Sequence, residues 1–488
     1  MRGIQTPVRN VRRRIFKEIA KFGYEQRNLQ DLEDLPYEII PGEVARYRDS
    51  IYRERAIVGE RLRLAMGMSL NPADKPTRIT KGIDESNISE KYYEPPLLQV
   101  IPSACNECKE KAFIVGEQCQ GCMAHPCMEV CPKKAISFKD GYSYIDQEKC
   151  IKCGQCKKVC PYGPCANACG VGAIETDYAG RAKINPDKCV SCGMCMVNCP
   201  FGAIADKSQI YQLIKAMNEG AEVIAILAPA FVGQFGPKAT PNKIKAALLD
   251  IGFADVWEVA VGADAGALEE AKHYVQSVAT GKLPFLLTSC CPSWSMLGKK
   301  YFPEVIDEIS NALTPMVATA RVARITSPNA KIVFVGPCVA KKLEASRRTV
   351  RSEVDFVITF EELAGMFDAK EIDFNTYEKE EELNDAFGAG RGYAIASGVA
   401  GAIKACIDEY YPGTEVKIDH VEGLAECKKM LLQAKAGKKK GYLIEGMGCP
   451  GGCVAGAGTN IPVVKAQIQV KKFIEEAEDF VPPETAQY

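Results

Sequence analysis

Apolar and polar positions follow different patterns in the two halves of the chain, with a change near residue 206. Beyond that point, short apolar runs alternate with segments of helical periodicity, which is typical of buried parallel strands joined by helices. Six apolar runs are predicted to be strands: Glu222–Leu227, Pro284–Leu287, Lys331–Val335, Asp355–Thr359, Gly392–Ala396 and Gly441–Ile444. We therefore expect a parallel α/β sheet, with the glycine-containing stretch 388–392 forming a turn.

The first 100 residues carry helical periodicity at Val11–Phe22 and within Gly42–Met66. Four prolines then interrupt the pattern, as they would in a linker: Pro72, Pro76, Pro95 and Pro96. No residue pattern here indicates a chemical function. This part is predicted to be a helical packing arm or cap.

Residues 101 to about 205 contain an internal repeat. Three segments have a cysteine followed four and five residues later by Ala-Ile, and they begin at Cys131, Cys169 and Cys199. Each segment is predicted to be a cysteine loop that returns to a short apolar strand.

Composition and charge narrow the function classes. The 61 Lys+Arg balance 62 Asp+Glu, so the basic excess common in nucleic-acid-binding proteins is missing. A hydrophobic content of 47% is enough for a buried core. The longest apolar run, Val223–Val232, is too short to cross a bilayer, and no signal peptide is recognised. We expect a cytoplasmic protein without membrane or nucleic-acid partners.

Cysteine is the unusual component. The chain has 23 cysteines, of which 16 lie between Cys105 and Cys199. Disulfide scaffolds belong to short secreted chains with small cores, so the thiolates of this chain are predicted to hold metal.

Two cysteine runs have the spacing Cys-x2-Cys-x2-Cys-x3-Cys-Pro of bacterial ferredoxins, in which three thiolates bind one [4Fe–4S] cube and the fourth binds the other. These runs are Cys150, Cys153, Cys156, Cys160 and Cys189, Cys192, Cys195, Cys199. On that rule, Cys199 would complete the cluster of the first run and Cys160 that of the second. Cys169 is an alternative to Cys160, and Cys165 lies between them.

A third run has a wider gap and consists of Cys119, Cys122, Cys127 and Cys131. Together with Cys105 and Cys108, the first two of these cysteines also fit a zinc ribbon, but the ferredoxin-like ending after Cys131 favours iron–sulfur. His125 is expected to be a bystander. Sixteen cysteines with four for each cube set an upper bound of four clusters, and we expect three to four accessory [4Fe–4S] clusters.

The cysteines of the second half follow predicted strands. Cys290 and Cys291 follow one strand, Cys338 follows the next, and Cys449 and Cys453 follow a third. Open α/β sheets place their sites at the carboxyl ends of strands. One metal centre assembled from three loops is therefore predicted.

These three loops resemble the signature loops of the [FeFe]-hydrogenases. They read Thr-Ser-Cys-Cys-Pro-Ser-Trp at 288–294, Gly-Pro-Cys-Val-Ala-Lys-Lys-Leu-Glu at 336–344 and Glu-Gly-Met-Gly-Cys-Pro-Gly-Gly-Cys at 445–453. With the ferredoxin runs, the resemblance covers roughly residues 101–470. It implies an α+β and α/β multidomain fold. The expected parts are a helical leader (1–100), a ferredoxin-like domain (101–205), a two-lobed catalytic domain (206–478) and a tail (479–488).

The resemblance also implies the cofactor and its contacts. A [4Fe–4S] subcluster would be held by four thiolates, those of Cys291, Cys338, Cys449 and Cys453. Cys453 would bridge to a diiron unit with CO, cyanide and azadithiolate ligands, completing the H-cluster. Lys341 would donate to a cyanide. Ser289, Met447 and the segment Ala228, Pro229, Ala230 would contact the diiron unit.

In the family, a cysteine relays a proton to the azadithiolate amine, and Cys290 matches it. A carboxylate–serine–carboxylate relay leads from there to solvent. Glu270 and Ser310 match its first two members, and His273 stands where the family has the second carboxylate. An imidazole at that place is expected to change the pH dependence of turnover.

Two departures from the usual pattern stand out. Gly336 replaces the methionine that usually precedes Pro-Cys, and residues 456–462 read Gly-Ala-Gly-Thr-Asn-Ile-Pro instead of a glycine triplet. Both resemble a less-studied branch, often called group B. Cys406 and Cys427 match no motif and are expected to be ordinary thiols.

The implied activity is reversible hydrogen oxidation and proton reduction. Electrons would come from or go to a soluble ferredoxin or a similar carrier, and hydrogenase maturation proteins would supply the diiron unit. No glycine-rich dinucleotide fingerprint follows a predicted strand. Two alternatives are a hydrogen sensor with slow turnover and a cytosolic iron–sulfur cluster carrier that lacks the diiron unit.

Overall fold

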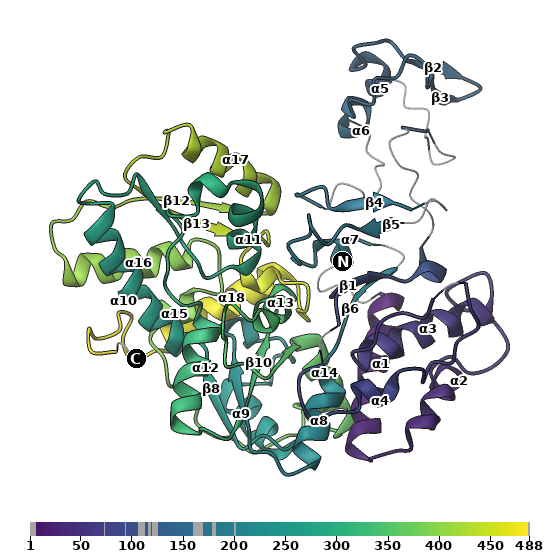
Figure 1. Ribbon diagram of the computed structural model, residues 1–488, viewed down its shortest axis with the longest axis horizontal. Coiled ribbons are helices and arrows are strands. Elements are labelled where there is room, and N and C mark those ends of the chain that lie inside the picture. Colours follow the sequence, from purple (N-terminus) through teal and green to yellow (C-terminus); the bar gives the residue numbers. More distant parts are fainter. Residues whose placement is uncertain are drawn as a thin grey trace.

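The computed structural model describes residues 6–72, 74–92, 94–105, 113–115, 119, 125–159, 169–177, 182–199 and 202–486. Four predicted ligands lie outside these ranges: Cys108, Cys122, Cys160 and Cys165. Figure 1 shows a body with two sheets, a cysteine-rich arm that extends away from it, and a group of N-terminal helices beside them.

The second half contains two parallel sheets. The four-stranded sheet has the order β11-β10-β7-β8, and the three-stranded sheet has the order β12-β13-β9. The strands are β7 (Val223–Leu227), β8 (Asp255–Glu258), β9 (Phe285–Leu287), β10 (Lys331–Gly336), β11 (Phe356–Thr359), β12 (Lys417–Glu422) and β13 (Tyr442–Met447). The predicted parallel α/β architecture is confirmed, although it is divided into two sheets.

Helices cover both sheets (Figure 1). They are α8 (Ile210–Asn218), α9 (Pro241–Asp250), α10 (Ala260–Ser277), α11 (Pro292–Tyr301), α12 (Pro315–Thr326), α13 (Ala340–Ser346), α14 (Phe360–Ala369), α15 (Gly388–Gly392), α16 (Gly398–Tyr410), α17 (Leu424–Lys435) and α18 (Val463–Glu475). β7 and β11 are buried at every residue, as continuous apolar strands of a covered parallel sheet should be.

Three expectations for this half were wrong. The run Gly392–Ala396 is not a strand, and 388–392 is the short helix α15 instead of a turn. Arg391 of α15 is buried and forms an ion pair with Glu258, at 2.7 Å. Strands β8 and β12 were missed because both carry charged residues among their apolar ones.

The cysteine-rich region consists of two-stranded antiparallel pairs and short helices. The pairs are β1 (Leu98–Val100) with β6 (Ile204–Asp206), β2 (Ile136–Lys139) with β3 (Tyr142–Ile145), and β4 (Ile174–Thr176) with β5 (Ala182–Ile184). The helices are α5 (Pro126–Glu129), α6 (Gln155–Val159) and α7 (Met194–Asn198). In Figure 1, β2, β3, α5 and α6 lie farthest from the two-sheet body.

The predicted repeat is confirmed. Strands β2, β4 and β6 begin five residues after Cys131, Cys169 and Cys199. In each repeat, the N–H of the alanine four residues after the cysteine donates to its Sγ, at 3.3, 3.2 and 3.3 Å respectively.

The N-terminal helices are α1 (Pro7–Tyr24), α2 (Leu35–Ile39), α3 (Ile51–Ala65) and α4 (Ile83–Ser86). Helix α1 packs on α14 and α8 (Figure 1). Gly365 permits the close crossing with α14, because an added Cβ would lie 2.6 Å from Cβ of Phe16. The predicted helical cap is therefore present, although its second long helix begins later than residue 42. No helix in the described ranges is long and apolar enough to span a membrane.

Candidate active site

Three loops meet between the two sheets. β9 leads to Cys290 and Cys291, β10 leads to Cys338, and β13 leads to the loop with Cys449 and Cys453. β9 and β13 are neighbours in one sheet, whereas β10 belongs to the other. The N–H of Gly448 donates to Cys291 Sγ at 3.4 Å, which ties the first loop to the third.

Glycines allow these loops to pack tightly. A Cβ on Gly446 would lie 2.1 Å from the Trp294 ring, whose Nε1 donates to Thr288 O at 3.1 Å. A Cβ on Gly456 would lie 2.3 Å from Pro337 O. Gly452 has a φ of 84°, a conformation that residues with a side chain rarely adopt.

The cysteines of this site are close enough to influence one another. Burial, and then the neighbouring thiols of Cys291 and Cys338, raise the pKa of Cys453. Burial, and then Cys291, raise the pKa of Cys338 to about 11. Iron binding would deprotonate such thiols, and thiolates are soft ligands suited to iron–sulfur clusters.

The donor set matches the thiolate ligands of a [4Fe–4S] cube. Across the described ranges, no three His, Cys, Asp or Glu side chains converge on one metal ion. The four thiolates of a [4Fe–4S] cube bind four different irons, so they stand apart from one another. Cys291, Cys338 and Cys453 lie within electrostatic reach of one another, and Cys449, on the same loop as Cys453, would supply the fourth thiolate.

Lys341 is the second residue of α13, three residues beyond Cys338, and is buried. Its Nζ lies 2.7 Å from Oε2 of Glu344 and 3.4 Å from the carbonyl oxygen of Cys290. Burial alone would lower the pKa of Lys341, but Glu344 and the nearby thiols Cys338 and Cys290 leave it raised. A charged ammonium is thus held next to the cysteine loops.

The residues predicted to contact a diiron unit lie at strand ends around the same space. Ala228 follows β7 and donates its N–H to Val335 O at 2.9 Å, and Pro229 and Ala230 begin the 3-10 helix η4 (Pro229–Phe231). Met447 is the buried last residue of β13. At Gly336, where the family has a methionine, the ring of Phe334 occupies the space of a side chain. An added Cβ would lie 2.4 Å from Cε1 of Phe334.

Two members of the predicted proton relay lie together. Oε1 of buried Glu270 is 3.2 Å from the N–H of Ser289 and 3.4 Å from its Oγ, and the Ser310 hydroxyl is also within hydrogen-bonding reach. Burial raises the pKa of Glu270 to about 7. Burial, then Cys291 and Glu270, raise the pKa of Cys290.

The structure does not connect His273 to these groups. His273 is half-buried, and among the described residues no hydrogen bond or ion pair joins its side chain to Glu270 or Ser310. A cavity of about 340 Å³ instead lies beside Ser289 and Ser310, and Glu344 also lines it.

Sequence reasoning missed two residues of this site. Glu344, the partner of Lys341, stands within the second loop motif but had no role assigned. The buried hydroxyl of Tyr393 has no hydrogen-bond partner among the described residues, and burial, then Glu270 and Cys290, raise its pKa. Tyr393 lies in a run that was predicted to be a strand, so nothing indicated its place.

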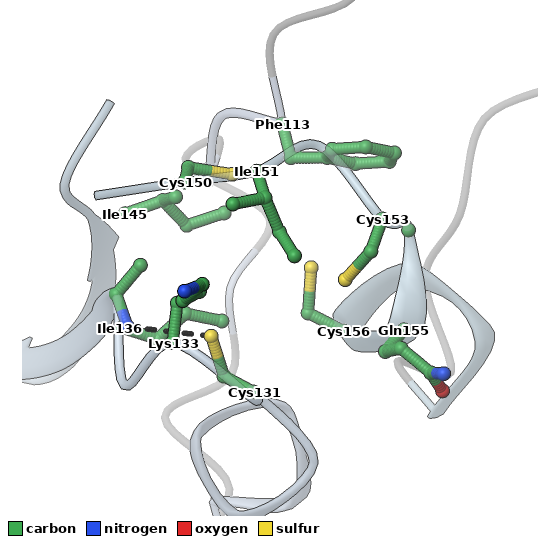
Figure 2. Close-up of a pocket in the computed structure, with 12 residues that line it drawn as sticks. Phe113, Cys131, Lys133, Ile136, Ile145, Cys150, Ile151, Cys153, Gln155 and Cys156 are labelled. Atoms are coloured by element: carbon green, nitrogen blue, oxygen red, sulfur yellow. Dashed lines mark hydrogen bonds between the residues drawn. The ribbon is translucent and has the colours of Figure 1, made fainter. Parts of the chain in front are cut away.

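The accessory cysteines pair differently from the expectation. Cys131 lines a pocket with Cys150, Cys153 and Cys156, and Figure 2 shows the four sulfur atoms around one shared space. Cys199 was expected there and lies elsewhere, packed against the cluster that contains Cys105. The hairpin β2–β3 explains the difference, because it folds the chain after Cys131 directly back to the next cysteine run.

The second cysteine group is also completed by the cysteine that precedes its hairpin. Cys169, one of the two alternatives, lies close enough to Cys189, Cys192 and Cys195 to raise the pKa of each, although burial is the larger cause. Hairpin β4–β5 joins it to that run. The other alternative, Cys160, lies outside the described residues.

Cys119 and Cys127 meet at Ser143. Its N–H donates to Cys119 Sγ at 3.5 Å, and its Oγ is 3.4 Å from Cys127 Sγ. Cys105 lies in a different apolar cluster, packed with Cys199. The zinc-ribbon alternative, which joined Cys105 to Cys119, therefore does not agree with the structure. His125 stacks on Phe138, with ring centroids 4.2 Å apart.

Comparisons with known proteins agree with this geometry. Residues 221–457 match the family model "Iron only hydrogenase large subunit, C-terminal domain". Residues 118–164 match a 4Fe-4S dicluster domain and residues 182–205 a 4Fe-4S binding domain.

The chain is similar to several curated proteins. It is 28% identical over 381 residues to the periplasmic [Fe] hydrogenase large subunit of Nitratidesulfovibrio vulgaris, covering 67% of this chain and 88% of that protein. It is 30% identical over 306 residues to iron hydrogenase 1 of Clostridium pasteurianum, covering 52% and 53%. It is 28% identical over 391 residues to the NADP-reducing hydrogenase subunit HndD of Solidesulfovibrio fructosivorans, covering 67% and 66%.

Solved structures match more weakly. An [FeFe]-hydrogenase structure from Chlamydomonas reinhardtii is 21% identical, with a TM-score of 0.44, over 53% of this chain and 86% of that one. The fold and the cysteine sets define an iron–sulfur protein with an α/β catalytic body. With the family matches, residues 221–457 form a catalytic domain of the iron-only hydrogenase type, and ferredoxin domains precede it.

Proposed function

We propose that the protein interconverts protons, electrons and molecular hydrogen (2 H⁺ + 2 e⁻ ⇌ H2) at an H-cluster. The four-cysteine site would hold its cube. One observation carries the proposal: half-buried Cys290 lies with buried Lys341 and Glu270 beside that site. A cluster carrier needs the four cysteines but has no use for a thiol beside a buried ammonium and a buried acid.

The H-cluster, when bound, would supply the iron centre at which protons and electrons combine. The Lys341 ammonium would bind an anionic ligand of that centre, and Glu344 keeps it charged. The Ser289 hydroxyl, which donates to Ala312 O at 2.9 Å, would provide a polar contact to the bound H-cluster.

Cys290 and Glu270 would move protons. A general acid–base group works best when its pKa is near the working pH, and Glu270 is in that range because it is buried. A proton on Glu270 can pass to Ser310, which lines the 340 Å³ cavity. We keep His273 as a proposed outer member of the relay, to be tested by the pH profile of a His273→Ala variant.

Electrons would pass through the accessory clusters. The group of Cys169, Cys189, Cys192 and Cys195 contacts the catalytic body: Lys300 Nζ lies 2.8 Å from Cys189 O, and Ser293 Oγ lies 3.3 Å from Val190 O. The group of Cys131, Cys150, Cys153 and Cys156 lies farther out in the arm (Figure 1). A soluble ferredoxin would exchange electrons there, although one relative is named as NADP-reducing.

The proposal includes the group B-like branch, maturation proteins that deliver the diiron unit, and a cytoplasmic location. The departures at Gly336 and at residues 456–462 support the branch. One relative is named as periplasmic, so the location needs its own test. Fractionation of native cells with an antibody against the chain would provide it.

Infrared spectroscopy of the anaerobic, matured protein tests the activity. We expect metal-bound CO and cyanide bands that shift between hydrogen and argon. Fixed bands would favour the sensor, and absent bands with intact cubes would favour the cluster carrier, a possibility raised by 36% identity over 92 residues to the cytosolic Fe-S cluster assembly factor NAR1 of Kluyveromyces lactis.

A pair of variants tests the role of the thiol. Cys290→Ala should keep the CO and cyanide bands and lose nearly all hydrogen turnover. Cys406→Ala is the matched control, because Cys406 is a buried thiol of α16 outside the site. Wild-type turnover in Cys290→Ala would remove this residue from the mechanism.

A further inference from the structure

The same turn geometry occurs three times, after Cys131, Cys169 and Cys199, the cysteines that begin the Ala-Ile repeats. Near Cys131, Asp146 N donates to Ala135 O at 2.8 Å, and Cys150 N donates to Asp146 O at 3.0 Å. Near Cys169, Asn185 N donates to Ala173 O at 2.8 Å, and Cys189 N donates to Asn185 O at 3.0 Å. In both cases the second cysteine begins the run that the first one completes.

The third occurrence joins residues that are far apart in the sequence. Ile101 N donates to Ala203 O at 2.8 Å, and Cys105 N donates to Ile101 O at 3.2 Å. The alanine N–H also donates to Cys199 Sγ at 3.3 Å, as in the other two repeats. Cys105 therefore has the same position relative to Cys199 as Cys150 has relative to Cys131. Neither of the two matched 4Fe-4S family models includes Cys105.

The surroundings of this pair come from the N-terminal segment. Ile57 and Leu64 of α3 form an apolar cluster with Cys105, and Cys199 packs against it. A Cβ on Gly202 would lie 2.5 Å from Cγ1 of Val8, so α1 packs directly against Gly202.

Three guanidinium groups of the same segment bind the backbone on both sides of the pair. Arg53 Nε donates to Ser103 O at 2.8 Å, and an Nη of Arg48 donates to Ala104 O at 3.4 Å. Arg61 donates to Gly202 O. We call Arg48, Arg53 and Arg61 the cationic clamp.

Arg61 is the most informative member of the clamp. It is only 7% exposed and forms no ion pair with a carboxylate in the part of the chain that the structure describes. Burial, and then Arg12, lower the pKa of its guanidinium to about 10, while Glu361 and then Cys199 oppose that shift. A buried cation needs a compensating anion, and an iron–sulfur cluster on Cys199 would provide one.

We propose that Cys105 and Cys199 ligate the same accessory [4Fe–4S] cluster, and that the cationic clamp holds this cluster and raises its reduction potential. One-electron reduction adds one negative charge to a cluster, so nearby positive charge favours the reduced form. The proposal gives the N-terminal helices a role in electron transfer. It rests on the proposed function for the presence of the clusters, but it can be tested without hydrogen turnover.

The first test counts iron in the full chain, reconstituted without the diiron unit. Cys105→Ala and Cys199→Ala should each lose about four iron atoms, and the double variant should lose no more than either single variant. The matched control combines Cys199→Ala with Cys131→Ala, which belong to different groups, and should lose about eight. A loss of about eight in the Cys105/Cys199 double variant would overturn the shared cluster.

The second test is a redox titration of the accessory clusters followed by electron paramagnetic resonance. In Arg61→Leu, the reduced-to-oxidised ratio of one cluster at a fixed potential should fall about tenfold, which corresponds to about 59 mV for a one-electron couple. Arg61→Lys keeps the charge and should restore most of the difference. The affected signal should be the one that Cys105→Ala removes.

Arg55→Leu is the control on the same helix, because Arg55 donates to Ile40 O and Gly42 O, away from the pair. Arg53→Gln changes a more exposed clamp residue and covers the case in which Arg61→Leu does not fold. No shift in either clamp variant, or an equal shift in Arg55→Leu, would overturn the clamp. These outcomes are independent of infrared bands and hydrogen turnover, so each proposal can fail separately.

Discussion

Burial determines the protonation of Glu270. Its pKa is raised from 4.5 to about 7, so between these pH values the folded chain keeps a proton that the unfolded chain has lost. The free energy of unfolding therefore falls as the pH rises through this window, by at most about 3 kcal/mol from this residue.

We expect Glu270→Gln to be less sensitive to pH over the same window, because an amide does not titrate. Thermal unfolding of the anaerobic wild type and variant, compared near both ends of the window, measures the difference. Burial also raises the pKa of Asp264 to about 8. Asp264 is present in both proteins, so its contribution to the pH dependence of unfolding is the same in each. Equal pH dependence of the two proteins would contradict the prediction.

At the residue scale, the sequence grouped the cysteines into motifs but did not determine how the accessory cysteines pair. The ferredoxin spacing assigns Cys199 to the preceding run, whereas the structure places Cys131 there. For Cys131 and Cys169, the hairpin that follows the cysteine decides the pairing. The Ala-Ile repeat already marked those hairpins, so the information was present but was not used for pairing.

Among the elements, β13 carries the tightest packing of the catalytic body. Gly446 faces the Trp294 ring with no room for a methyl group. We expect Gly446→Ala to lower the free energy of unfolding by about 1–3 kcal/mol through overpacking and to reduce the iron content, since β13 leads to Cys449 and Cys453.

Gly401→Ala is the matched control for that change. Gly401 lies on α16 with nothing within 4 Å of an added Cβ, so alanine should be neutral or stabilise the helix by up to about 1 kcal/mol. Thermal unfolding and iron analysis measure both variants. A Gly446→Ala protein as stable and iron-loaded as the control would show that the ring moves aside.

Strands were predicted correctly where the apolar run is continuous, and they were missed where the strand itself contains charged residues. β7 and β10 are apolar and were predicted. β8 begins with Asp255, which accepts from Trp257 Nε1 at 2.6 Å, and ends with Glu258, the partner of Arg391. The Glu258–Arg391 pair is buried and joins distant parts of the chain, so the local sequence pattern gives no indication of it.

At the scale of the whole molecule, Lys342 joins three parts of the chain. Its Nζ lies 2.8 Å from Asp206 of β6 and 2.9 Å from Glu362 of α14. Arg12 of α1 extends the network to Glu361, at 2.7 Å. The cysteine-rich region, the catalytic body and the N-terminal helices thus share one set of buried charges.

We expect Lys342→Met to lower the free energy of unfolding by about 3–5 kcal/mol, because it removes the nearest cation from two buried carboxylates. Lys404→Met, which removes an exposed pair with Asp408, should change it by less than about 1 kcal/mol. Thermal unfolding of the two variants side by side tests the difference. Similar losses in both would show that the buried network contributes little.

The pairing of β1 with β6 has a consequence for the architecture of the chain. It sets Leu98 opposite Asp206 and Val100 opposite Ile204, so the segment between them leaves and rejoins the rest of the protein at adjacent points. A segment with neighbouring ends can be lengthened, shortened or exchanged without moving what it is attached to. The number of cysteine-rich repeats in this arm is therefore free to change while the two-sheet body keeps its shape.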